Sequence, residues 1–233
     1  MNTFRRYAVY WAPPAGPLAT FTASWLGWDA ATGTERPHPA LPGLPATVED
    51  LTDAPRKYGF HGTLKPPFRL VDGAAPERLC AAVARLAAGL APVRMEGLRL
   101  ARLGKFLALV PVGDTAGLGC LAATLVKELD PWRAPLTTED ILRRHAAKLN
   151  PTQKALLDRW GYPYVMDEFR FHLTLTGALA DEAGAEALAK VLEPVLAPIL
   201  PTPFVVEDIC IFGEAEDGRF HLLHRYPFAC VSG

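Results

Sequence analysis

The chain has 233 residues, 50% of them apolar and 21% charged, which is enough for one large domain or two small ones around a substantial core. Lysine and arginine total 24 against 25 acidic residues, giving a net charge of −1. This balance argues against a long polyanion-binding surface but fits a small anionic ligand. The 4 cysteines lack the spacing of a zinc or redox site, and no stretch reaches the ~18 apolar residues of a membrane span or forms a signal core. We expect a cytoplasmic protein with reduced thiols that does not contact a membrane.

In the first half, residue type and spacing predict strands and helices in alternation. Residues 35–55 are Pro-rich and aperiodic, which predicts a surface connection. A strand is expected within 56–70, stopped by Pro66 and Pro67. The other expected elements are a strand at about 5–12, a helix over 18–29, a helix over 77–91, and strands near 93–103 and 105–112.

The second half repeats this order, with a helix after the strand at 105–112, a motif strand over 168–177, a helix over 182–197 and a hairpin over 204–228. We therefore predict an α+β, bilobal duplicated fold. Its two antiparallel sheets, with flanking helices, would be related by a pseudo-two-fold axis around a central cleft. The repeats would span about 5–104 and about 105–228.

A helical insertion over about 131–164 breaks the symmetry. Thr137 or Thr138 can cap its first helix, and Pro151 fits the first turn of the second. The insertion is rich in basic residues. A solvated helical face is the simpler interpretation, and a cationic cover over an anionic ligand is the alternative. The basic residues are Arg143, Arg144, His145, Lys148, Lys154 and Arg159.

The most specific chemical signal is a His-x-Thr motif written once in each half, as HGTL at 61–64 and HLTL at 172–175. Side chains alternate along a strand, so His61 and Thr63 share one face, as do His172 and Thr174. One such match would mean little in a chain with 6 histidines. Two matches at equivalent places in a duplicated order indicate function.

Two imidazoles suit in-line displacement at phosphorus. Near neutral pH one histidine can accept a proton from the attacking hydroxyl while the other donates one to the departing oxygen. Thr63 and Thr174 would donate hydrogen bonds to the non-bridging phosphate oxygens. This chemistry requires no metal or other cofactor, and the chain has no HxH or HExxH spacing to support a metallohydrolase.

With these motifs the chain resembles the two-histidine (HxTx) phosphoesterases, the LigT-like superfamily that includes 2'-5' RNA ligases and cyclic phosphodiesterases. The segments RYAVYWAPP and KYGFHGTLKPPF are similar to a DUF1045-like bacterial branch found beside phosphonate-metabolism genes. The resemblance implies that His61 and His172 are catalytic and that Thr63 and Thr174 bind phosphate. Gly62 departs from the family, which usually has an apolar residue there, and could let the backbone approach a ligand closely.

Strand parity ranks the neighbouring residues. Lys65 shares the face of His61, and Arg170 that of His172, so each is a candidate phosphate-binding residue, with a solvated strand end as the alternative for Lys65. Residues of the opposite parity, Tyr58, Phe60 and Leu64, are expected to pack against a helix. The aromatic residues of the first strand are expected mainly in the core. His221 and His224 are an odd number of positions apart and are expected on opposite sides of their strand.

The sequence thus predicts an enzyme that opens a cyclic phosphodiester, of the 2',3'-cyclic nucleotide or ribose cyclic phosphate type, with a possible link to phosphonate metabolism. The expected partner is a small phosphorylated sugar or nucleotide, with an RNA end as a further option, because tight polynucleotide binding needs many phosphate contacts. Two alternatives remain open: a non-catalytic module that binds a phosphorylated ligand, and an RNA 2'-5' ligase or RNA-end phosphodiesterase.

Overall fold

A computed structural model describes residues 4–145 and 149–229, and the side chains of residues 142–145 lie outside this description. The predicted α+β class is confirmed: helices surround a seven-stranded antiparallel sheet, and two further sheets have two strands each. None of the helices in the described ranges has the length and apolarity needed to cross a membrane.

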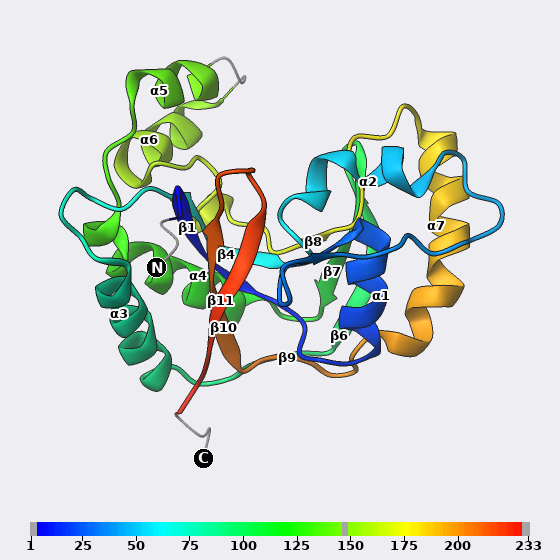
Figure 1. The fold of residues 1–233 in the computed structure, drawn as a ribbon, viewed down its shortest axis with the longest axis horizontal. Helices are drawn as coiled ribbons and strands as arrows, with labels where there is room; N and C mark the ends of the chain where they lie inside the picture. Colours follow the sequence, from blue (N-terminus) through cyan, green and yellow to red (C-terminus); the bar gives the residue numbers. More distant parts are fainter. Residues whose placement is uncertain (1–3, 146–148, 230–233) are drawn as a thin grey trace.

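The strands and helices follow the predicted alternation closely (Figure 1). The strands are β1 Arg6–Trp11, β2 Trp28–Asp29, β3 Thr34–Glu35, β4 Gly62–Phe68, β5 Val93–Met95, β6 Gly97–Leu103, β7 Phe106–Val112, β8 Leu173–Thr174, β9 Phe204–Val206, β10 Asp208–Glu214 and β11 Phe220–Pro227. The helices are α1 Pro17–Leu26, α2 Val48–Arg56, α3 Pro76–Ala88, α4 Ala116–Glu128, α5 Thr138–His145, α6 Pro151–Trp160 and α7 Glu182–Leu196, with 3-10 turns at Asp130–Trp132, Met166–Glu168 and Ala197–Ile199.

The main sheet has two lobes that meet at its middle. Its strand order is β11-β10-β1-β4-β8-β7-β6. Helices α3 and α4 pack on the strands of the first lobe, β11 to β4. Helix α7 packs on β6 and β7 in the second lobe, which α1 reaches through a 2.8 Å hydrogen bond from Trp25 Nε1 to the Leu175 carbonyl. In Figure 1 these two groups of helices lie on opposite sides of the molecule.

Each lobe contains strands from both halves of the chain. Strands β10 and β11 lie in the second half but pair with β1 in the first lobe, and β6 lies in the first half but pairs with β7 in the second. The predicted boundary between the repeats, at residues 104 and 105, falls in the turn between β6 and β7. The lobes are therefore interleaved in sequence, and the repeat boundaries stay a prediction.

Residues 36–47 form an irregular, mostly exposed connection as predicted, but helix α2 occupies the end of that segment, so the prediction is wrong for residues 48–55. The Thr47 side chain caps the helix by accepting a 3.1 Å hydrogen bond from the Asp50 amide. Val48, Leu51 and Pro55 are buried along one face, at helical spacing. Pro55 has no N–H to donate to the Leu51 carbonyl, which instead accepts a 2.7 Å hydrogen bond from the Gly177 amide.

Strand β4 runs through Pro66 and Pro67 to Phe68, so these prolines do not stop it as predicted. The strand pairs with β1 along its length but with β8 at one residue pair only. Its second edge is therefore open beyond that pair. A proline is tolerated where no partner strand needs its missing N–H.

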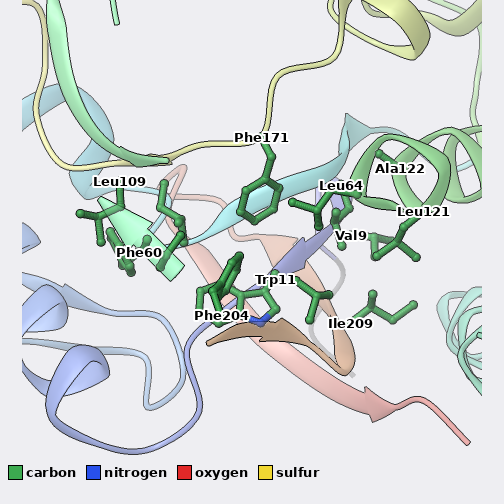
Figure 2. Packing of buried hydrophobic residues seen from close by; sticks show 14 of the residues in the cluster. Val9, Trp11, Phe60, Leu64, Leu109, Leu121, Ala122, Phe171, Phe204 and Ile209 are labelled. Carbon is green, nitrogen blue, oxygen red and sulfur yellow. The ribbon is translucent and has the colours of Figure 1, made fainter. Parts of the chain in front are cut away.

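The core joins the two lobes beneath the motif strands, where the Phe171 ring packs against Gly62. A Cβ atom at Gly62 would lie 2.2 Å from Cζ of Phe171. Figure 2 shows the Phe171 ring projecting among the labelled core residues, and its centroid is 6.0 Å from that of Phe204. The glycine thus makes room for a core ring on the face opposite His61. The expectation that it lets a ligand approach is wrong.

This packing predicts that Gly62→Ala destabilises the fold. Overpacking a core typically costs about 1–3 kcal/mol, and we expect a loss in this range in chemical denaturation. Combining Gly62→Ala with Phe171→Leu should recover part of the loss, because the smaller side chain relieves the contact. Gly119→Ala is the matched control, since nothing lies within 4 Å of a Cβ there. Equal stability of the Gly62 and Gly119 variants would contradict the packing argument.

Candidate active site

One residue pair brings the two His-x-Thr motifs together. Gly62 in β4 is paired with Leu173 in β8, and the strands are antiparallel. In an antiparallel pair, one step forward along the first strand corresponds to one step back along the second. His61 is therefore placed across from Thr174, and Thr63 across from His172. Cβ atoms of opposed residues are typically about 5 Å apart, so both motifs contribute to one site.

The two imidazoles are held in the same way. Nδ1 of His61 is 2.9 Å from the carbonyl oxygen of Gly59, and Nδ1 of His172 is 2.8 Å from that of Arg170. A carbonyl only accepts, so each Nδ1 carries the proton and donates it. In the neutral ring Nε2 is then the free acceptor. Each motif thus presents an Nε2 atom that can take or give a proton.

A cavity of about 610 Å3, here called the cleft, opens beside these residues. His61, Thr63 and Thr174 line it. His172 is not among the lining residues, but its positive charge acts on the pKa of His61, so the two rings are electrostatic neighbours. A cavity of this size fits a mononucleotide or a sugar phosphate.

The environments of the two histidines differ. The ring of Tyr10 stacks on His61 with centroids 3.9 Å apart, and Tyr10 is only 1% exposed. Burial, together with the charge of His172, lowers the pKa of His61 to about 4, although the hydrogen bond to Gly59 opposes the shift. His172 is partly exposed and has the ring of Phe106 at 5.6 Å. At neutral pH His61 is uncharged and ready to accept a proton.

Lys65 does not reach the cleft, so the prediction that it shares the face of His61 is wrong. Tyr10 is paired with Thr63 but Val9 with Lys65, so β4 has one extra residue between these pairs. Such a β-bulge reverses the alternation of side chains. Lys65 is 2% exposed, and its Nζ donates a 3.2 Å hydrogen bond to the Val126 carbonyl in α4. Burial lowers its pKa to about 8.

Arg170 lies just before β8, where the chain is not yet a strand. Its Nη1 donates hydrogen bonds of 2.9 Å and 2.6 Å to the carbonyls of Asp167 and Phe169, and the side chain is exposed. Its guanidinium is thus directed to its own turn and does not line the cleft. A role in phosphate binding remains a prediction for this residue.

Side-chain alternation predicted the wrong surroundings for Tyr58, and two basic residues at the cleft, Lys57 and Arg6, were not predicted there. Tyr58 precedes β4, so alternation does not apply, and it lines the cleft with its ring stacked on Phe220 at 5.0 Å. Lys57 is exposed at the cleft, with Nζ 5.1 Å from the centre of the Tyr58 ring. Arg6 also lines it, on the strand face of Tyr10, a residue that was expected mainly in the core.

Glu214 largely neutralises Arg6. Its carboxylate accepts hydrogen bonds of 2.5 Å from Nε and 2.7 Å from Nη2 of the guanidinium. This bidentate pair fixes the arginine at the wall of the cleft.

As predicted, Phe60 and Leu64 lie in the core, at 7% and 1% exposure.

The predicted helices of the insertion are present. Thr137 caps α5, because its hydroxyl accepts a 3.2 Å hydrogen bond from the Asp140 amide, and Asn150 and Gln153 form a capping box at α6. Tyr162, which follows α6, lines the cleft. The basic side chains proposed as a cover do not line it where they are described, and those of Arg143, Arg144, His145 and Lys148 lie outside the described residues.

Within the ranges 4–145 and 149–229, no three His, Cys, Asp or Glu side chains are grouped so that they could hold a metal ion. The polar groups at the cleft are instead the His61 imidazole, threonine and tyrosine hydroxyls, and the side chains of Arg6 and Lys57. Such a set is suited to moving protons and binding phosphate oxygens.

A family model described as a protein of unknown function (DUF1045) matches residues 63–221. The chain belongs to the DUF1045 family. The matched segment includes Thr63, His172 and Thr174 and starts two residues after His61. The DUF1045-like resemblance predicted from the sequence is confirmed.

Two curated relatives of this DUF1045 protein are described as ribose 1,5-bisphosphate phosphokinase PhnN. The one from Janthinobacterium sp. (strain Marseille) is 37% identical over 98% of the chain and 52% of the relative. The one from Laribacter hongkongensis (strain HLHK9) is 34% identical over 98% of the chain and 53% of the relative. The chain spans about half the length of these relatives.

Among solved structures, Escherichia coli LigT complexed with 3'-AMP matches with a TM-score of 0.42 and 15% identity, over 98% of this chain and 100% of LigT. The protein TT0787 of Thermus thermophilus matches with a TM-score of 0.44 and 15% identity, over 96% and 98% of the two chains.

The lowered pKa of His61 predicts a pH-dependent stability. As the pH falls from about 6.5 towards 4, the unfolded chain takes up a proton at residue 61 before the folded chain does, so the fold loses stability. The slope is at most about 1.4 kcal/mol per pH unit, and His61→Gln should remove it. Urea unfolding of both proteins between pH 8 and pH 4 measures the difference. Parallel curves would show that His61 is not held neutral.

Proposed function

We propose that the cleft opens a cyclic phosphodiester by paired-histidine acid-base catalysis that needs no metal. The observation that carries the proposal is the antiparallel pairing of β4 with β8, which places each motif histidine across from the threonine of the other motif. In this proposal the two halves of the chain supply a base, an acid and two hydroxyls to one site. This is the constellation predicted from the resemblance to two-histidine phosphoesterases.

In the proposed reaction His61 is the general base. It is uncharged at neutral pH, and its Nε2 accepts a proton from the attacking water. The water oxygen bonds to phosphorus as the opposite ester bond breaks. Protonated His172, the more exposed ring, donates its Nε2 proton to the leaving ribose oxygen. The product is a phosphomonoester, and the two histidines exchange protonation states before the next turnover.

Thr63 and Thr174 would donate hydrogen bonds to the non-bridging oxygens, where negative charge increases in the transition state. Both hydroxyls are at the cleft. Neither one forms a hydrogen bond with a group of the described residues. They are thus available to a ligand.

The proposed substrate is small, either a ribose cyclic phosphate or a 2',3'-cyclic nucleotide. The volume of the cleft supports this size, and Tyr58 and Tyr162 could cover a sugar or base. The description of the relatives as ribose 1,5-bisphosphate phosphokinases favours a phosphorylated ribose and a link to phosphonate metabolism. We do not extend their kinase activity to this chain, because its 233 residues contain no G-x-x-x-x-G-K-S/T phosphate-binding sequence.

The proposal predicts hydrolysis of a ribose cyclic phosphate or a 2',3'-cyclic nucleotide in the presence of EDTA. His61→Gln and His172→Gln should each lower kcat by about 10²- to 10⁴-fold, the usual contribution of a general acid or base. Arg170→Ala tests the remaining phosphate-binding prediction and should raise KM if that residue binds substrate. Equal turnover in wild type and both histidine variants would refute the assignment.

A second measurement separates catalysis from simple binding. Thr63→Ala should lower kcat by about 10²-fold or more, whereas Thr63→Ser, which keeps the hydroxyl, should retain most activity. Binding of inorganic phosphate by calorimetry gives the affinity of each variant. If Thr63→Ala weakens phosphate binding but no cyclic phosphate is turned over by the wild type, the cleft is a binding module and the enzyme assignment fails.

A further inference from the structure

A second cavity, of about 810 Å3, lies on the other face of β1 from the cleft, and no residue lines both. Its walls come from the start of the chain, the turn before β3, helix α3 and strand β11. Tyr7 lines it from β1, whereas Tyr10, three residues later, lines the cleft. The proposed reaction uses none of the groups in this second cavity.

A β-bulge in β11 directs two histidines into it. Ile211 is paired with His224 but Phe212 with Leu222, so Leu223 is the extra residue. Because of this extra residue, His221 and His224 face the same side of β11, as residues two positions apart do in a regular strand. Both line the cavity. The prediction that they lie on opposite sides of the strand is wrong, because it counted residues without the bulge.

The Tyr7 hydroxyl is the feature that points to a ligand. Tyr7 is 2% exposed, and its hydroxyl is the one buried side-chain polar atom of the described residues without a hydrogen-bond partner. Burial raises the pKa of Tyr7, and the nearby Phe4 backbone, which opposes this shift, does not meet the geometry of a hydrogen bond to the hydroxyl. A buried hydroxyl without a partner typically costs about 1–3 kcal/mol. A polar group of a bound molecule would remove that cost.

Charge limits the class of molecule. The lining residues include no lysine or arginine, so an anion such as phosphate has no counter-charge there. Glu77 is the one carboxylate, at the exposed start of α3, and the two imidazoles would oppose a cation when protonated. Five of the described lining residues carry aromatic rings, and the His224 and Tyr226 rings are 5.9 Å apart. Flat walls with a few hydrogen-bonding groups suit an uncharged aromatic ring.

We propose that this cavity binds an uncharged heteroaromatic ring of the nucleobase class, with the Tyr7 hydroxyl hydrogen-bonded to its polar edge and the rings of β11 packed against it. The site is separate from the cleft, and the proposal does not depend on the reaction there.

The first test uses the full chain with ¹⁵N-labelled histidine and adenosine as the probe. The 6 histidines include the two motif histidines, of which His61 lines the cleft, and two that line this cavity, so their signals report which site is occupied. Saturable shifts of His221 and His224 support the proposal. Shifts confined to His61 and His172 overturn it, as does the absence of any shift at millimolar adenosine. Shifts of His221 and His224 with choline or inorganic phosphate instead of adenosine would overturn the assigned class.

The second test is Tyr7→Phe, which removes only the hydroxyl. We expect adenosine affinity to fall by about two- to tenfold, as for one lost hydrogen bond. The melting temperature of the free protein should stay equal or rise, because the unpartnered hydroxyl is gone. Tyr164→Phe, at a 47% exposed tyrosine, is the matched control and should change neither quantity. A lower melting temperature with unchanged adenosine affinity would assign the hydroxyl a structural role and overturn the proposal.

Discussion

The pairing of Gly62 with Leu173 is the contact on which the site depends. It is the one residue pair that hydrogen-bonds β4 to β8 and so joins the strands of the two lobes into one sheet. It also sets which motif residues oppose one another. The contact is possible because residue 62 has no side chain, which leaves room for the Phe171 ring on the core side. The same glycine thus serves core packing on one face and the geometry of the site on the other.

Two motifs of the same chemical type become different through their surroundings. His61 lies against Tyr10 and is held uncharged, whereas His172 is half-buried and lies just before the two-residue strand β8. The Nδ1 contacts of the two rings are alike, and burial is the main cause that lowers the pKa of His61. An acid and a base need opposite protonation at the same pH, and unequal burial is a direct way to obtain it.

The sequence predicted the fold class, most elements and the two motifs, because these depend on local periodicity and residue type. It could also have revealed α2, since Thr47 and Asp50 form a capping pattern before buried residues at helical spacing. The failures for Lys65 and His224 share one cause. Each follows a β-bulge that reverses side-chain alternation, and a bulge depends on pairing with a distant strand. Counting along one strand cannot detect it.

Tyr58 and Arg6 were missed for reasons that also lie beyond a single strand. Tyr58 lies in the turn after a helix that was not predicted, so strand parity was applied where there is no strand. Arg6 has the parity of Tyr10, but its place at the cleft follows from the pairing of β1 with both β4 and β10. Long-range strand order, rather than residue type, brings these side chains to the site.

The most direct test of the central claim is a crystal structure with inorganic phosphate bound. The account predicts one anion within hydrogen-bond distance of Nε2 of both His61 and His172, with a protonated phosphate oxygen donating to the uncharged His61 ring. The same anion should accept hydrogen bonds from the hydroxyls of Thr63 and Thr174. A phosphate that contacts one motif only, or imidazoles whose Nε2 atoms point away from a common anion, would contradict it.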